Sequence, residues 1–206
     1  MTPPKCDNAK GARAAKIELR RNVLELVRPS RVFDAFCGLG EMWRGVWRDA
    51  EEYLGCDERQ WTQSEQHRRL VCDNKLALRA LDLSRFNVFD FDAYGSPWEQ
   101  MTILAARRRW ECGERGAVVF TDGTSMKLRF GGLPHSMASL VGVPTHKGAT
   151  DADTDVIVRM ALSAWLRRCN VRPLRQWLAQ GHGSEKGGTR MLYTAVVFEG
   201  KAISDS

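Results

Sequence analysis

The sequence lacks the cysteine and histidine patterns that mark metal centres and disulfide-stabilised folds. Its six cysteines are scattered, never as a C-x-x-C pair, and its four histidines are equally dispersed. Cys37, Cys56 and Cys72 lie in apolar runs, where cysteine behaves as a small buried hydrophobic residue. We therefore expect neither a disulfide framework nor a bound metal.

Long hydrophobic runs are also absent. No segment approaches the roughly 20 apolar residues that a membrane span requires. Residues 1–16, MTPPKCDNAKGARAAK, contain no apolar core of the kind that a signal peptide needs. We expect a cytoplasmic protein that contacts no membrane.

The composition that remains is that of one globular domain with a basic excess. Of 206 residues, 43% are hydrophobic and 27% are charged, and the formal net charge is +6. Most of the positive charge is arginine, whose guanidinium fork matches phosphate geometry and favours a polyanionic partner. A genome rich in arginine codons would produce the same excess, so the charge alone does not identify a partner.

Residues 1–30 contain a basic amphipathic helix, which we predict over residues 12–28. Its apolar residues recur at near-helical spacing, while Arg13, Lys16 and Arg20 gather on another face. This basic face is either an additional phosphate contact or simply the solvated side of a core helix.

Strands and helices alternate after residue 30. We predict strands at 31–37, 52–57, 69–74, 86–92 and 116–124, each followed by a helical or turn segment, and a closing hairpin at 173–181 and 191–200. This order predicts an α/β fold with a doubly wound, mostly parallel seven-stranded sheet and a C-terminal antiparallel hairpin. Residues 31–200 then form a single domain with a glycine-rich insertion at 125–150.

The first strand-to-helix turn, DAFCGLGEMW, is the expected ligand site of such a sheet. Gly38 and Gly40 permit a close approach of the backbone. A phosphate-binding loop would need Gly-Lys-Ser/Thr, and a dinucleotide site needs a small residue where Trp43 stands. A cofactor with a sulfonium or an amine, such as S-adenosylmethionine, would instead suit Asp34 and Glu41.

Two further acids follow the next strands. Asp57 is placed to accept hydrogen bonds from ribose hydroxyls, and Asp73 could accept one from an adenine amine. Aspartate at a strand end also commonly caps the following turn, and for Asp73 taken alone that is the simpler explanation.

The segments VFDAFCGLG, YLGCD, VCDN and FDFDAYGSPW resemble, in this order, the successive motifs of the class I S-adenosylmethionine-dependent methyltransferases. The resemblance covers residues 31 to about 124, and the terminal hairpin extends it to about 199. It implies a Rossmann-like fold, a methyltransferase activity and S-adenosylmethionine as the cofactor. The cofactor-binding residues that it implies are Asp34, Phe36, Gly38, Gly40, Asp57, Asp73 and Asn74.

Within that family, DAYGSP is most similar to the DPFGSP turn of the tRNA guanine-N2 dimethyltransferases. Ala93 stands in place of the proline, which makes the turn less rigid. We expect no separate C-terminal RNA-binding domain of the kind that those enzymes carry.

The DAYGSP turn gives the candidate catalytic residues. An exocyclic amine needs acceptors for its N–H bonds and a platform that fixes the plane of its base. We assign these roles to Asp92 and Tyr94; the alternative is that Tyr94 packs on the following helix and Asp92 caps it. Asp90 is assigned to the opposite face of the strand in a structural role, and Asp122 is a lesser candidate for the acceptor pocket.

Three functions remain open. The first is methyl transfer to a nucleic-acid base, an exocyclic amine in RNA ahead of DNA. The second is methyl transfer to a small molecule or a protein, and the third is a non-catalytic binding module. Cytosine C5 chemistry is excluded because DAYGSPW offers no cysteine nucleophile.

Overall fold

The computed structural model describes residues 10–61, 67–125, 132–142, 151–182 and 190–202. The chain forms the following helices (α), 3₁₀-helices (η) and strands (β) in order: α1 (Lys10–Leu26), β1 (Arg31–Asp34), α2 (Glu41–Gly45), η1 (Trp47–Asp49), β2 (Glu52–Asp57), β3 (Arg69–Val71), α3 (Asn74–Ala80), η2 (Leu83–Arg85), β4 (Val88–Phe91), α4 (Trp98–Arg107), β5 (Arg115–Asp122), α6 (His135–Val141), α7 (Asp151–Arg168), β6 (Val171–His182) and β7 (Arg190–Gly200).

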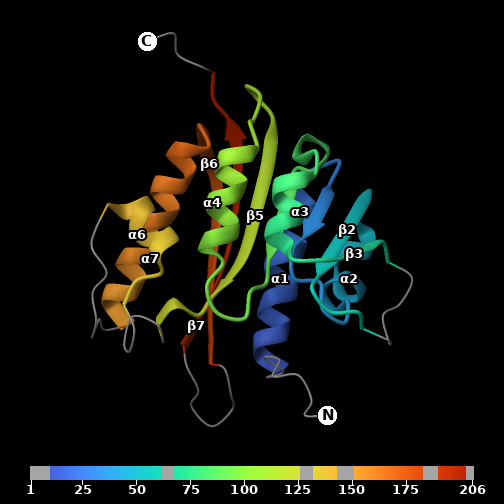
Figure 1. Ribbon diagram of the computed structural model, residues 1–206, viewed down its shortest axis with the longest axis horizontal. Coiled ribbons are helices and arrows are strands. Elements are labelled where there is room, and N and C mark those ends of the chain that lie inside the picture. Colours follow the sequence, from blue (N-terminus) through green and yellow to red (C-terminus); the bar gives the residue numbers. More distant parts are fainter. Residues whose placement is uncertain (1–9, 62–66, 126–131, 143–150, 183–189, 203–206) are drawn as a thin grey trace.

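The strands form one seven-stranded sheet in the order β3-β2-β1-β4-β5-β7-β6 (Figure 1). Strands β1 to β5 pair in parallel, whereas β7 runs antiparallel to both β5 and β6. The predicted doubly wound sheet with a C-terminal hairpin is therefore confirmed. The order reverses between β1 and β4, the point at which such sheets bind ligands.

Alternate residues of each strand enter two separate cores. Phe33 and Phe89 face α3, α4, α6 and α7, which lie in front of the sheet in Figure 1. Val32 and Val88 face the core that contains α1, α2 and η1. Both faces of the central strands are buried, which explains why these strands read as continuous apolar runs in the sequence.

The helix after the first strand differs from the prediction. Trp43, Val46, Trp47 and Ala50 have the spacing of one long helix, but α2 ends at Gly45. Val46 adopts φ −148° and ψ −57°, and a 3₁₀-helix follows. The break lets the indole of Trp47 reach a buried carboxylate, so a tertiary contact overrides the local helical pattern.

Part of the glycine-rich segment belongs to the core. Leu133 and Met137 are buried against the helices on the front of the sheet, so this part of the expected insertion at 125–150 packs into the core. Residues 126–131 and 143–150 of the segment lie outside the described residues.

No described helix has the length and apolar character needed to cross a bilayer. Among the described residues, no three His, Cys, Asp or Glu side chains are grouped so that they could hold a metal ion.

Candidate functional site

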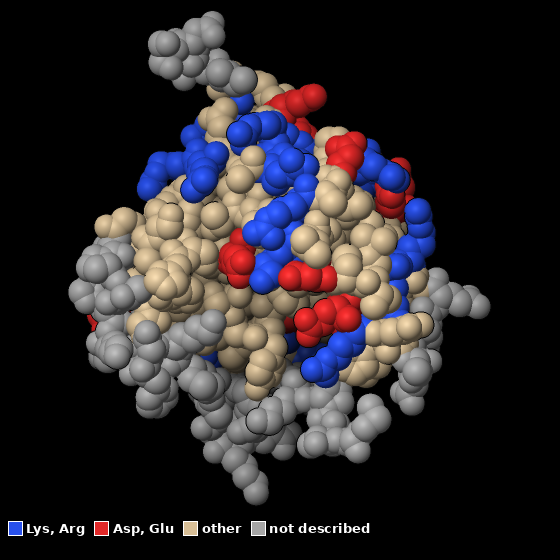
Figure 2. Space-filling view, in the orientation of Figure 1, with Lys and Arg blue, Asp and Glu red and all other residues tan. Residues whose placement is uncertain are grey.

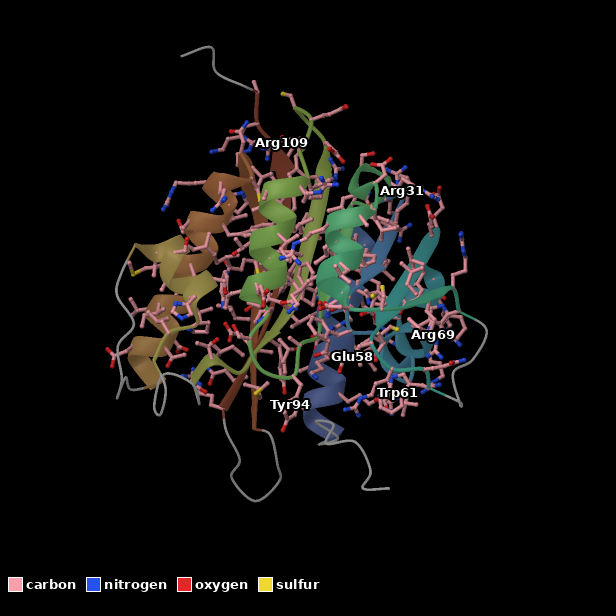
Figure 3. All side chains as sticks on the ribbon, viewed as in Figure 1. Arg31, Glu58, Trp61, Arg69, Tyr94 and Arg109 are labelled. Atoms are coloured by element: carbon pink, nitrogen blue, oxygen red, sulfur yellow. The ribbon has the colours of Figure 1, made fainter. Side chains whose placement is uncertain are left out.

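The carboxyl ends of β1, β2, β3 and β4 open into a cleft of about 520 Å³. Glu58, Trp61 and Tyr94 lie at this end of the molecule, and Arg109 lies at the other (Figure 3). The cleft is lined by Ala35, Phe36, Asp57, Glu58, Arg59, Trp61, Asp73, Asn74, Lys75, Tyr94 and Gln100. Five of the nine predicted site residues, Phe36, Asp57, Asp73, Asn74 and Tyr94, are among them.

Gly38 and Gly40 shape the turn beside the cleft without lining it. Both have positive φ, +48° and +80°, a conformation that residues with a side chain rarely adopt. A Cβ atom on Gly40 would lie 2.7 Å from Cε1 of His67. The backbone N–H of Gly38 donates to Oδ2 of Asp57 at 3.0 Å, which ties the turn to the end of β2.

Asp57 is held as an ordered carboxylate at the cleft. Its Oδ1 accepts from the backbone N–H of Arg59 at 2.9 Å, while Oδ2 accepts from Gly38. A carboxylate has about four acceptor sites, so about two remain for hydroxyl groups of a ligand.

Asp73 and Asn74 have structural partners as well as a place in the cleft. Asp73 caps α3 by accepting from the backbone N–H of Lys75 at 2.8 Å. The Nδ2 of Asn74 donates to the Ala35 carbonyl at 2.9 Å, and its Oδ1 accepts from Nε2 of Gln100 at 3.0 Å. Asn74 thus links the end of β1 to α4 across the floor of the site.

Tyr94 lies at the rim of the cleft with 77% of its surface exposed. It is not packed on α4, contrary to the alternative that the sequence left open. The turn that carries it is fixed where the N–H of Gly123 donates to the Gly95 carbonyl at 2.6 Å.

Asp90 and Asp92 both face α1, and neither lines the cleft. Arg20 donates to the two oxygens of Asp90 at 2.6 and 2.7 Å and lies 3.8 Å from Asp92. The assignment of Asp90 to the opposite face is therefore wrong, because side chains two residues apart in an extended chain point to the same side. Asp92 also contacts Lys16 at 2.9 Å and accepts from the Thr121 hydroxyl at 2.5 Å.

The basic face expected on the N-terminal helix is likewise corrected. Lys16 and Arg20 are buried, Arg20 with only 1% of its surface exposed, and they hold the carboxylates under α1. Arg13 alone of the three is exposed, 3.9 Å from Glu41.

Asp34 also lies on the α1 side and does not line the cleft. It is buried, and it accepts from the Tyr53 hydroxyl at 2.9 Å and from the Phe36 backbone N–H at 3.1 Å. Burial, followed by the charge of Asp90, raises its pKa well above the usual range.

The pKa values of the other two carboxylates, Asp90 and Asp92, shift in opposite directions. Burial raises the pKa of Asp90 despite its contacts with Arg20 and Trp47. Burial alone would also raise the pKa of Asp92, but the charges of Lys16 and Arg20 and the Thr121 hydrogen bond outweigh it and lower that pKa. Asp92 is therefore anionic at neutral pH, with 16% of its side chain exposed.

Asp122 does not line the cleft, so it does not shape an acceptor pocket there. Its carboxylate is buried and accepts from the Trp98 indole and from the Thr124 backbone N–H, both at 2.7 Å. It stabilises the turn after β5 and the start of α4.

Gln100 and Trp61 are cleft residues that the sequence reasoning missed. Each has a buried side-chain atom that finds no hydrogen-bond partner within the described residues, Oε1 of Gln100 and Nε1 of Trp61. A signal existed for Gln100, because it stands one helical turn before Leu104 among the buried residues of α4. A polar residue within an apolar helical face requires an explanation.

No protein-family model and no curated protein sequence matches the chain. Similar solved structures include the 1,6-didemethyltoxoflavin-N1-methyltransferase of Burkholderia thailandensis with S-adenosylhomocysteine, at 14% identity and a TM-score of 0.52, covering 94% of this chain and 82% of that one. Another is Trm1 of Pyrococcus horikoshii with S-adenosyl-L-methionine, at 15% identity and a TM-score of 0.59; the match covers 94% of this chain but only 56% of Trm1.

The N-methyltransferase NodS of Bradyrhizobium japonicum WM9, with S-adenosylhomocysteine, is a third. It is 11% identical with a TM-score of 0.51, and the match covers 92% of this chain and 87% of NodS. These likenesses agree with the observed α/β fold and its seven-stranded sheet. The chain therefore has the fold of the class I S-adenosylmethionine-dependent methyltransferases.

Proposed function

We propose that the protein is an S-adenosylmethionine-dependent methyltransferase whose acceptor is a nucleic-acid base, an exocyclic amine in RNA ahead of one in DNA. The observation that carries this proposal is the cleft at the point of strand reversal. There, cofactor-type residues (Phe36, Asp57, Asn74) and the exposed ring of Tyr94 share one cavity.

The cleft residues fit a nucleoside cofactor. Asp57 has acceptor sites left for sugar hydroxyls, and Phe36 offers an apolar surface. Gln100 and Trp61 have buried polar atoms that no described residue pairs with. A volume of about 520 Å³ suits a ligand of this size. When bound, S-adenosylmethionine supplies an activated methyl group on a sulfonium.

Asp34 has an indirect role in this proposal. Its Oδ1 accepts from the backbone N–H of Phe36, so it positions the turn that borders the cofactor. The expected contact of its carboxylate with the cationic end of the cofactor is not part of the arrangement, because Asp34 does not line the cleft.

Tyr94 and Asp92 act on the acceptor. The Tyr94 ring is exposed at the rim, where it can stack on an unpaired or extruded base. The lowered pKa of Asp92 keeps it an acceptor for an amine N–H. It does not line the cleft, but part of its side chain is exposed beside Lys16 and Thr121, two residues before Tyr94 at the rim.

A polyanionic acceptor is supported by charge and by the turn sequence. Lys and Arg side chains gather over the end of the molecule that holds Arg109, opposite the cleft, and extend towards the middle of the same face, so they would contact an extended polyanion away from the reacting base (Figure 2). The turn DAYGSP resembles that of the tRNA guanine-N2 dimethyltransferases, and the fold matches that of Trm1.

The test is transfer of labelled methyl groups from the cofactor to total tRNA, rRNA or DNA. Loss of a base-stacking ring costs roughly 1–3 kcal/mol, so Tyr94→Ala should lower the labelling rate about 5- to 150-fold. Asp92→Asn should lower it as well, whereas Asp49→Asn, an exposed matched control, should not. Equal labelling by the Tyr94 and Asp92 variants and the unmodified protein would remove both residues from the mechanism.

A small-molecule acceptor is the second candidate, since the toxoflavin enzyme shares the fold. The effect of salt concentration distinguishes a nucleic-acid acceptor from a small-molecule acceptor. Nucleic-acid binding should weaken steeply as salt rises because phosphate contacts release counterions, whereas a small neutral acceptor should be nearly indifferent. Absence of cofactor binding at millimolar concentration would favour the third possibility, a non-catalytic module.

A further inference from the structure

Gln100 lines the cleft and has a buried acceptor with no partner among the described residues. The residue is only 8% exposed, and its Oε1 accepts no hydrogen bond from any part of the chain that the structure describes. A buried polar atom left unpaired costs about 1–3 kcal/mol, so a ligand that satisfies it gains affinity.

The orientation of this amide follows from a chain of three groups. The Ala35 carbonyl can only accept, so the Asn74 atom that faces it at 2.9 Å must be the donor Nδ2. Oδ1 of Asn74 therefore faces Gln100. The Gln100 atom that contacts it at 3.0 Å must be the donor Nε2. The remaining atom, Oε1, can only accept, and the ligand group that pairs with it must be a donor.

We propose that Oε1 of Gln100 accepts a hydrogen bond from the exocyclic amine of the cofactor's adenine ring. Asn74 holds the Gln100 amide in the orientation that this contact requires. This inference rests on the proposed cofactor. It assigns to Gln100 the hydrogen bond with the adenine amine that the sequence analysis had assigned to Asp73. One oxygen of Asp73 already caps α3, and its side chain is 45% exposed, so water can satisfy the other.

The test compares two ligands by isothermal titration calorimetry. S-adenosylhomocysteine carries the amine, and S-inosylhomocysteine carries an oxo group in its place, which Oε1 would repel. We expect the unmodified protein to prefer the adenine compound by at least about tenfold. In Gln100→Met, which keeps the length of the side chain but removes the acceptor, we expect that preference to fall about tenfold.

Two further variants make the result specific. Gln100→Glu retains an acceptor at this position and should keep the preference for the amine even if overall affinity drops. Gln180→Met, an exposed glutamine on β6, should leave both affinities unchanged. Circular dichroism and thermal unfolding show whether each variant is folded.

The possible failures are distinguishable. If the unmodified protein binds neither compound, the proposed function itself is wrong. If it binds S-adenosylhomocysteine and Gln100→Met discriminates between the two ligands as well as the unmodified protein does, the role of Gln100 is refuted while the proposed function stands.

Discussion

At the scale of single residues, the charged cluster beneath α1 is the least ordinary feature of the molecule. Three carboxylates (Asp34, Asp90 and Asp92) face two cations, Lys16 and Arg20. If all were ionised, one negative charge would remain uncompensated in a buried region. Burial is the main cause of the raised pKa of Asp34, and the charge of Asp90 adds to it, while the hydrogen-bond partners of Asp34 are a tyrosine hydroxyl and a backbone N–H.

Arg20→Met should destabilise the fold strongly. The substitution leaves Asp90 buried without its bidentate partner, and removal of one member of a buried ion pair costs about 3–5 kcal/mol. The free energy of unfolding from urea denaturation measures this cost. The exposed neighbour Arg21 provides the matched control, and Arg21→Met should change stability by less than about 0.5 kcal/mol.

A second substitution tests whether the unpaired charge is the cause. Adding Asp90→Asn to Arg20→Met should recover part of the loss, because the uncompensated carboxylate is then gone. If the double variant is as unstable as the sum of the two single variants, lost packing explains the effect instead.

Asp34→Asn should change how stability depends on pH. The folded-state pKa of Asp34 is raised, so the folded protein holds this proton more tightly than the unfolded chain, whose aspartate pKa is about 3.9. Stability relative to the Asp34→Asn variant is therefore greatest below that value. It falls as pH rises towards the folded-state pKa, with a slope of at most about 1.4 kcal/mol per pH unit.

Urea denaturation of both proteins between about pH 4 and pH 8 checks this sign. The amide introduced by Asp34→Asn can still accept from the Phe36 N–H and donate to the Tyr53 oxygen, so both hydrogen-bond contacts of residue 34 can be kept. Parallel stability curves for the two proteins would mean that Asp34 has no raised pKa in the folded state.

At the scale of elements, β7 and the turn after α4 approach so closely that only glycine fits at residue 200. A Cβ atom on Gly200 would lie 1.9 Å from the backbone carbonyl oxygen of Glu111, which already accepts from the backbone N–H of Glu114 at 3.0 Å. Gly200→Ala should lower the free energy of unfolding by about 1–3 kcal/mol, as overpacking of a rigid contact does.

Gly45→Ala is the matched comparison. The added Cβ would meet Cδ1 of Ile17 at 3.1 Å, the flexible end of a side chain, and alanine is the better helix former. We expect a change within about 0.5 kcal/mol by the same urea measurement. Equal effects of the two substitutions would show that the contact at Gly200 is not rigid.

The elements themselves were largely predictable, and their ends were not. The fully apolar strands and the glycine turn are local patterns, and the predicted order of strands and helices is confirmed. Helix α2 ends earlier than its pattern predicts because Trp47 turns inwards to donate to Asp90 at 2.6 Å. No local pattern encodes a partner 43 residues away.

At the scale of the whole molecule, binding of the cofactor should stabilise the fold. A ligand at about 100 times its dissociation constant adds about 2.7 kcal/mol, which for a chain of this length raises the melting temperature by about 5–11 °C. S-adenosylhomocysteine should give this shift in differential scanning fluorimetry, and Asp57→Asn should reduce it. NAD is the control, and a shift with NAD but none with S-adenosylhomocysteine would contradict the proposed cofactor.

The sequence by itself determined the fold, because the alternation of apolar strands with amphipathic helices and the glycine turn after the first strand are encoded within short windows. It also placed Asp57, Asn74 and Tyr94 at one end of the sheet, since the carboxyl ends of parallel strands must meet there. Only the tertiary structure decided which way the charged side chains of α1 point. Lys16 and Arg20, which resemble a solvated face in the helical pattern, are buried because carboxylates on and just after β4 lie beneath them. It also decided the orientation of Gln100, which depends on two hydrogen bonds between segments distant in the chain.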